Sequence, residues 1–86
     1  VSEWATRVTP DFFRVVGVAP LHGRTFGPGS AAAREAVIEF GLWRRAFAER
    51  PLSGGLTLTI GEQPFTVVGV MPPGTHLSAG GVWIPD

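Results

Sequence analysis

The stretch LTLTIGEQPFTVVGVM, residues 56–71, decides the fold of this chain. Two runs rich in apolar and β-branched residues, 56–60 and 64–71, flank the short segment Gly-Glu-Gln. Runs of this kind joined by a short loop that starts with glycine are typical of a β-hairpin. We therefore expect an antiparallel hairpin over these residues.

The second run of the hairpin contains a phrase that occurs once more in the chain. FTVVGVMP, residues 65–72, matches FRVVGVAP, residues 13–20, at six of eight positions. The first copy follows Thr-Pro-Asp, which is typical of a helix start with Thr9 as N-cap and Pro10 at the first helical position. We expect a helix of about two turns there, closed by Gly17.

The two copies do not indicate an internal repeat. Their similarity stops directly after both prolines, whereas a structural repeat would continue over about 20 residues or more. We interpret the copies as one apolar phrase used twice, once at a helix and once in a strand.

The remaining residues predict a small α+β fold, a mixed α/β module with short helices packed on a β-sheet that contains the hairpin. Residues 41–49 have helical spacing, which places Leu42 with Ala46 and Trp43 with Phe47 on one apolar stripe. The segments between the regular elements are rich in glycine and proline and predict loops. The further expected strands are 3–8, 35–40 and 82–84.

The composition fits one globular domain at most. The 86 residues are 44% hydrophobic and 16% charged, which argues against disorder. Seven arginines balance seven acidic residues, and lysine is absent, so we expect no nucleic-acid partner. Cysteine is absent, and no apolar run approaches the ~20 residues that span a bilayer. Because the chain starts with Val and ends just after an apolar stretch, we expect an excerpt of a longer protein.

The sequence gives little support to an enzyme. His22 and His76 are the only imidazoles, and neither has a companion at metal-ligand spacing. No serine lies in a G-x-S-x-G turn, and without lysine a phosphate-binding Walker loop is excluded. We expect no catalytic residue, no cofactor and no metal site.

Two arginine-containing segments have alternative interpretations. Trp43 and the two arginines after it could form a basic-aromatic patch, but a buried Trp43 beside solvated arginines is the stronger interpretation. Arg24, in HGRTF, is expected to lie in a tight turn and to tie loop carbonyls together. Contact with a partner or ligand is the alternative for Arg24.

Four phrases in order resemble a known family. VTPDFFRVVGVAPLHGRTF (8–26), AVIEFGLWRRAF (36–47), GLTLTIGEQPFTVVGVMPPG (55–74) and VWIP (82–85) resemble the MacB-like periplasmic core domain of ABC-transporter permeases, the FtsX-like group. The resemblance covers nearly the whole chain. One departure is Glu39, which stands where the family usually has serine before its second helix, so that helix should survive with a less sharply fixed start.

The resemblance implies a role on the periplasmic side of the bacterial inner membrane. Residues 1–86 would be part of the core domain of a permease whose other segments lie in the membrane, and both VVGV phrases would be core. The permease would be a homodimer that works with an ATPase subunit or domain, and with a periplasmic adaptor and an outer-membrane channel. Its function would be to relay ATP-driven conformational change to an export substrate or to periplasmic partners. The alternative is a free-standing soluble extracytoplasmic binding module.

Partner contacts are expected in loops, because the strands are committed to the core. The candidate contact residues are His22, Gly23, Arg24, Thr75 and His76.

Overall fold

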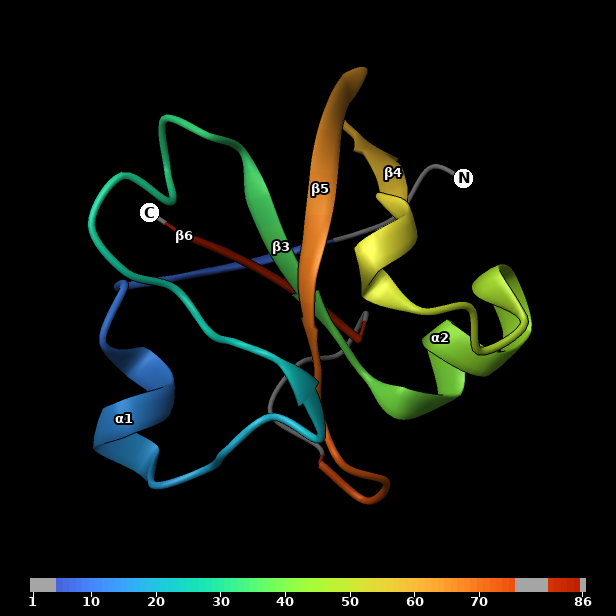
Figure 1. Ribbon diagram of the computed structural model, residues 1–86. Helices are drawn as coiled ribbons and strands as arrows, with labels where there is room; N and C mark the ends of the chain where they lie inside the picture. The colour runs from blue at the N-terminus through green and yellow to red at the C-terminus, as the bar shows by residue number, and fades with distance from the viewer. Residues whose placement is uncertain (1–4, 76–80, 86) are drawn as a thin grey trace.

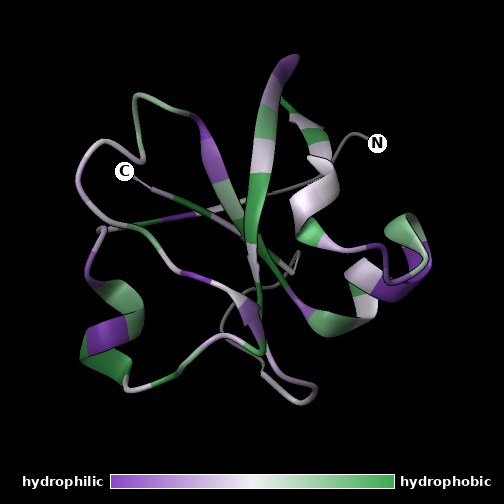
Figure 2. Ribbon diagram, in the orientation of Figure 1, coloured by the Kyte–Doolittle hydropathy of each residue, from purple (hydrophilic) through white to green (hydrophobic). Residues whose placement is uncertain are grey.

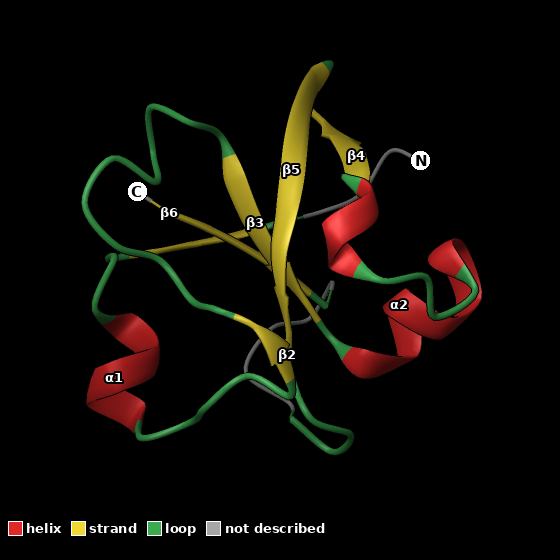
Figure 3. Ribbon diagram, in the orientation of Figure 1, coloured by secondary structure: helices red, strands yellow, loops and turns green. Residues whose placement is uncertain are grey.

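The computed structural model describes residues 5–75 and 81–85 (Figure 1). In this part of the chain, six strands form one sheet, accompanied by two α-helices and a short 3₁₀ turn (Figure 3). The elements in order are β1 (Thr6–Val8), α1 (Phe12–Val16), β2 (His22–Gly23), β3 (Glu35–Ile38), α2 (Phe40–Phe47), η1 (Leu52–Gly54), β4 (Thr57–Ile60), β5 (Gln63–Val70) and β6 (Val82–Pro85). The mixed sheet with its two short helices confirms the expected α+β class.

The hairpin is built as expected from β4 and β5. Gly61 and Glu62 connect the two strands, and both have positive φ, 55° and 70°. Two consecutive residues with positive φ match the right-handed twist of the strands that they join. The first half of β5 pairs with β4, while its second half pairs with β2.

The strand order of the sheet is β1-β6-β3-β5-β2, with β4 also on β5. β1 runs parallel to β6, β6 antiparallel to β3, and β3 parallel to β5. The register between β3 and β5 shifts once, because Ala36 pairs with Val67 and Val37 pairs with Gly69. The shift leaves Val68 without a paired residue in β3. The carbonyl of Val68 accepts a hydrogen bond from the N–H of Arg24 at 2.9 Å.

Two hydrophobic clusters cover the two faces of the sheet. Alternation along β3 places Ala36 and Ile38 in the cluster under α2, and Val37 in the cluster under α1. Trp83 on β6 is fully buried and meets the ring of Phe13 with 5.4 Å between centroids. Figures 1 and 2 show α1 and α2 on opposite sides of these strands, which carry much of the hydrophobic colouring.

Helix α2 confirms the predicted stripe with small changes at its ends. Leu42, Trp43 and Phe47 are buried, while the arginines at 44 and 45 are exposed. The helix begins at Phe40, inside the segment expected to be a strand, and Ala48 ends it in the left-handed region with φ 52°. Glu39 occupies the N-cap without a side-chain capping bond, as its poor capping ability predicts.

The first copy of the apolar phrase differs from expectation. The helix begins at Phe12, because the N–H of Phe12 donates to the carbonyl of Thr9 at 2.9 Å and closes a turn there. Thr9 is therefore not the N-cap, and α1 has five residues in place of two full turns. Gly17 closes the helix at φ 77°, as predicted.

The expectation that both VVGV phrases lie in the core is wrong for the first copy. Val15 is 74% exposed and Val16 is 43% exposed, whereas Val67 in the second copy is 2% exposed. A helix of five residues buries only one face, and α1 buries Phe13. Within the described ranges, no helix is long and apolar enough to span a bilayer.

Candidate functional site

The first candidate residues, His22 and Gly23, form the short edge strand β2 and do not lie in a turn. β2 approaches β5 very closely, and a Cβ at Gly23 would collide with the carbonyl oxygen of Val68. Gly23 also has φ 73°, a conformation that glycine adopts without strain. Glycine is therefore required at position 23 so that β2 can complete the sheet.

His22 faces the end of helix α2. Its ring lies 4.8 Å from the ring of Trp43, measured between centroids. The indole N–H of Trp43 donates to the carbonyl of Arg50 at 2.8 Å, which fixes the chain after the helix. A hollow of about 370 Å³ lies between His22, Glu49 and Leu52. His22 is thus exposed, with the ring of Trp43 as an aromatic neighbour.

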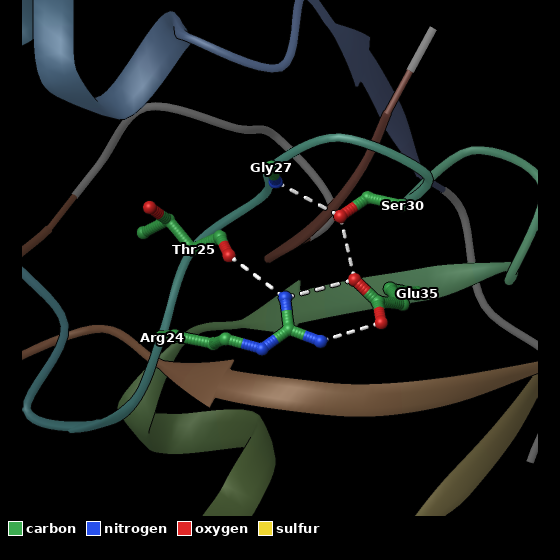
Figure 4. A network of polar contacts seen from close by, with 5 residues as sticks. All are labelled: Arg24, Thr25, Gly27, Ser30 and Glu35. Carbon is green, nitrogen blue, oxygen red and sulfur yellow. Dashed lines mark hydrogen bonds and ion pairs between the residues drawn. The ribbon is translucent and has the colours of Figure 1, made fainter.

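Arg24 belongs to a different site, the polar network of Figure 4. Its two terminal nitrogens donate to the two carboxylate oxygens of Glu35, at 2.9 Å (Nη1 to Oε1) and 2.5 Å (Nη2 to Oε2). Nη1 also donates to the carbonyl of Thr25 at 3.1 Å. Arg24 therefore bonds one loop carbonyl, as expected. It also binds the carboxylate of Glu35, a partner that sequence reasoning did not find.

Ser30 extends this network into the loop. Its hydroxyl donates to Oε1 of Glu35 at 2.6 Å and accepts the N–H of Gly27 at 2.9 Å. Ser30 is only 3% exposed, so these bonds satisfy a buried hydroxyl. The hydrogen bond from Arg24, supported by the one from Ser30, lowers the pKa of Glu35 despite partial burial. The same pairing raises the pKa of Arg24.

The network holds a loop that forms one wall of a groove at the described surface. This groove has a volume of about 690 Å³. Residues 25–32 of the loop line one side, and Pro10, Asp11 and Arg14 line the other. The Arg14 guanidinium lies 3.5 Å from the Asp11 carboxylate, so this wall carries one charge of each sign and no net charge. The remaining lining is mostly small and apolar.

Thr75 lies apart from both sites. Its hydroxyl and its N–H both point to the carbonyl of Pro72, at 2.9 and 3.3 Å, and close a turn after β5. The end of β5 that leads to this turn is the one that pairs with β2, where His22 lies opposite Val70. His76 lies outside the described residues.

The structure thus separates candidates that are adjacent in sequence. His22 faces α2, while Arg24 is bound to Glu35 on β3. Sequence reasoning missed Glu35 and Ser30, and the only available signal was an acidic residue at the start of a predicted strand. Among residues 5–75 and 81–85, no three His, Cys, Asp or Glu side chains come together to hold a metal ion.

Comparison with known proteins supplies the family. The model of the MacB-like periplasmic core domain matches residues 2–86. No curated protein matches the chain. The family consists of periplasmic domains of ABC-transporter permeases, which are inner-membrane proteins that work with an ATPase. Since the match spans nearly every residue, this chain belongs to the family of MacB-like periplasmic core domains.

Proposed function

We propose that this chain is a rigid extracytoplasmic element through which a permease relays ATP-driven movement to its export substrate or periplasmic partners. The main support for this relay is the pairing of two strands. β1 and β6, the first and last described strands, are parallel neighbours, and Thr6 pairs with Trp83. Forces that enter the domain at either strand therefore act on the same sheet.

The core supports transmission of such forces without deformation. β6 also pairs with the central strand β3, and Val82, Trp83 and Ile84 are all buried. Their side chains divide between the two hydrophobic clusters, so α1 and α2 are both packed onto this strand pair. Close-packed interiors transmit displacement because they have few voids into which side chains could yield.

The proposed partners follow from the same role. ATP hydrolysis takes place in the ATPase, and the permease acts as a homodimer that engages an adaptor and an outer-membrane channel. His22, Gly23, Arg24, Thr75 and His76 remain proposed contact positions. Replacing Arg24 would not test partner contact alone, because it would also break the hydrogen bonds to Glu35. His22→Ala leaves that network intact and is the better probe of partner contact.

The movement can be measured in the full permease. These 86 residues contain no cysteine, so Thr57→Cys on the exposed side of β4 provides a single spin-label site per copy once any cysteines elsewhere in the permease are replaced. We expect the distance between the labels of the two copies to change between nucleotide-free and ATP-bound permease. An unchanged distance, in a permease that still hydrolyses ATP and transports, would overturn the relay.

A further inference from the structure

The groove between α1 and the loop 25–32 has the properties of a binding surface. Among the described residues, the large hydrophobic side chains that are exposed are Val15, Val16 and Leu21, and two of these lie on α1. The N–H of Val15 donates to the carbonyl of Asp11 at 3.0 Å, so the two residues are one helical turn apart. Val15 therefore extends the apolar surface beyond the wall that contains Asp11.

We propose that this groove binds an extended, uncharged apolar segment of a partner protein. The inference deepens the proposed function and rests on it for the expectation of a protein partner. Charge is the first reason. The lining holds one cation and one anion, Arg14 and Asp11, which pair with each other. A charged ligand would therefore meet no net opposite charge on the lining.

The second reason is the chemistry of the loop wall. Ser30 bonds both the N–H and the carbonyl of Gly27, and the N–H of Ala33 donates to the carbonyl of Gly29. The N–H groups of Gly29, Ala31 and Ala32 on this wall have no hydrogen bond within the described residues. Covering these three N–H groups with a hydrocarbon chain would leave them without hydrogen bonds, which is costly. A peptide supplies both apolar side chains and main-chain hydrogen-bonding groups. The groove is accordingly better suited to polypeptide than to an acyl chain.

Shape and charge argue against the other occupants. Two copies of one concave surface cannot fill each other in a two-fold contact, where the same patch faces itself. A bilayer surface would be attracted by a net positive charge beside the apolar patch, and here the Asp11 carboxylate lies 3.5 Å from Arg14 and leaves the lining without one.

The groove also has a wall that is held in place before binding. The loop 25–32 is part of the segment 25–34, which begins after Arg24 and ends before Glu35, and the bidentate pair between these residues joins the two ends of that segment. Ser30 ties the middle of the loop to the same carboxylate at 2.6 Å. A preformed wall reduces the entropy that binding must remove, which favours affinity from a small contact.

The experiment titrates the full chain, labelled with ¹⁵N, with the peptide acetyl-Gly-Val-Leu-Val-Gly-amide. We expect amide shifts at Gly29, Ala31 and Ala32, and none at the hairpin turn around Glu62. Ala32→Glu places a charge on the groove wall and should weaken binding at least about tenfold. Ala33→Glu is the matched control, since Ala33 is equally exposed but does not line the groove. Val15→Asp is a second variant that should also weaken binding.

Any one of several other outcomes would overturn the proposal. These outcomes are no groove shifts at saturating peptide, equal binding of the same peptide with glutamate in place of valine, or equal effects of Ala32→Glu and Ala33→Glu. Groove shifts with dihexanoyl phosphatidylcholine but not with the peptide would assign the groove to lipid. Shifts that grow with protein concentration alone would assign it to a second copy. The relay itself would remain open in all these cases, because the distance between permease copies tests it separately.

Discussion

The two copies of the apolar phrase, residues 13–20 and 65–72, show how context assigns different roles to the same side chains. Val15 and Val67 occupy equivalent positions in the phrase, yet the first is 74% exposed and the second is 2% exposed. The first copy lies in a short helix with one buried face, while the second lies in a strand with neighbours on both sides. The difference separates a surface available for contacts from a surface committed to the core.

The glycines of the two copies differ in the same way. Gly17 has φ 77° and open space around it, so it is needed for its backbone conformation. Gly69 has no positive φ, but a Cβ there would collide with the carbonyl oxygen of Arg24. One glycine permits a turn, and the other permits two strands to approach.

The largest expected effect comes from replacing these glycines by alanine. Gly69→Ala forces β2 away from β5 and should lower the free energy of unfolding by about 3 kcal/mol, the scale of an overpacked core. Gly17→Ala places alanine in the left-handed region and should cost only about 1 kcal/mol. Urea unfolding of both variants measures the two values. Equal losses would show that the close approach at Gly69 is not what distinguishes the copies.

Replacing the equivalent valines of the two copies by alanine should give the next largest difference in the free energy of unfolding. Val67→Ala removes two buried methyl groups and should cost about 2 kcal/mol. Val15→Ala removes exposed methyls and replaces a β-branched residue with a better helix former, so stability should stay constant or rise by a few tenths of a kcal/mol, on the order of the propensity difference. Thermal unfolding checks the opposite signs. A destabilised Val15→Ala variant would contradict the exposed position of this side chain.

Removing the charge of Glu35, which pairs with Arg24 beside the second copy of the apolar phrase, should have a smaller effect on the free energy of unfolding. The pKa of Glu35 is lowered in the folded chain, so its stabilising contribution is present above the ordinary pKa and is lost as pH falls through the lowered value. Glu35→Gln should cost about 1 kcal/mol at neutral pH, a modest figure because Arg24 is largely exposed. The difference from the unmodified chain should shrink in acid. Glu49→Gln, which alters an exposed pair with Arg44, is the matched control. A difference that is constant with pH would show that the charge of Glu35 does not contribute.

The sequence predicted elements better than it predicted their contacts. Local signals were sufficient for the hairpin, for α2 and for the closing glycine of α1, because turn chemistry and periodicity involve neighbouring residues. The burial of the first phrase could not be inferred, because a helix of five residues leaves no periodic pattern to read. The Arg24–Glu35 pair joins residues 11 positions apart through a loop, and no local spacing indicates it. The partition of His22 and Arg24 between two sites depends on the sheet pairing of β2.

The proposed relay requires that the domain moves as one rigid body. It can be tested directly in the full permease with spin labels at Val15→Cys on α1 and Thr57→Cys on β4, which Figure 1 shows on opposite sides of the molecule. We expect the distance between these labels to be the same in nucleotide-free and ATP-bound permease. A distance that changes with nucleotide would contradict it, because the sheet would then deform and not transmit the movement.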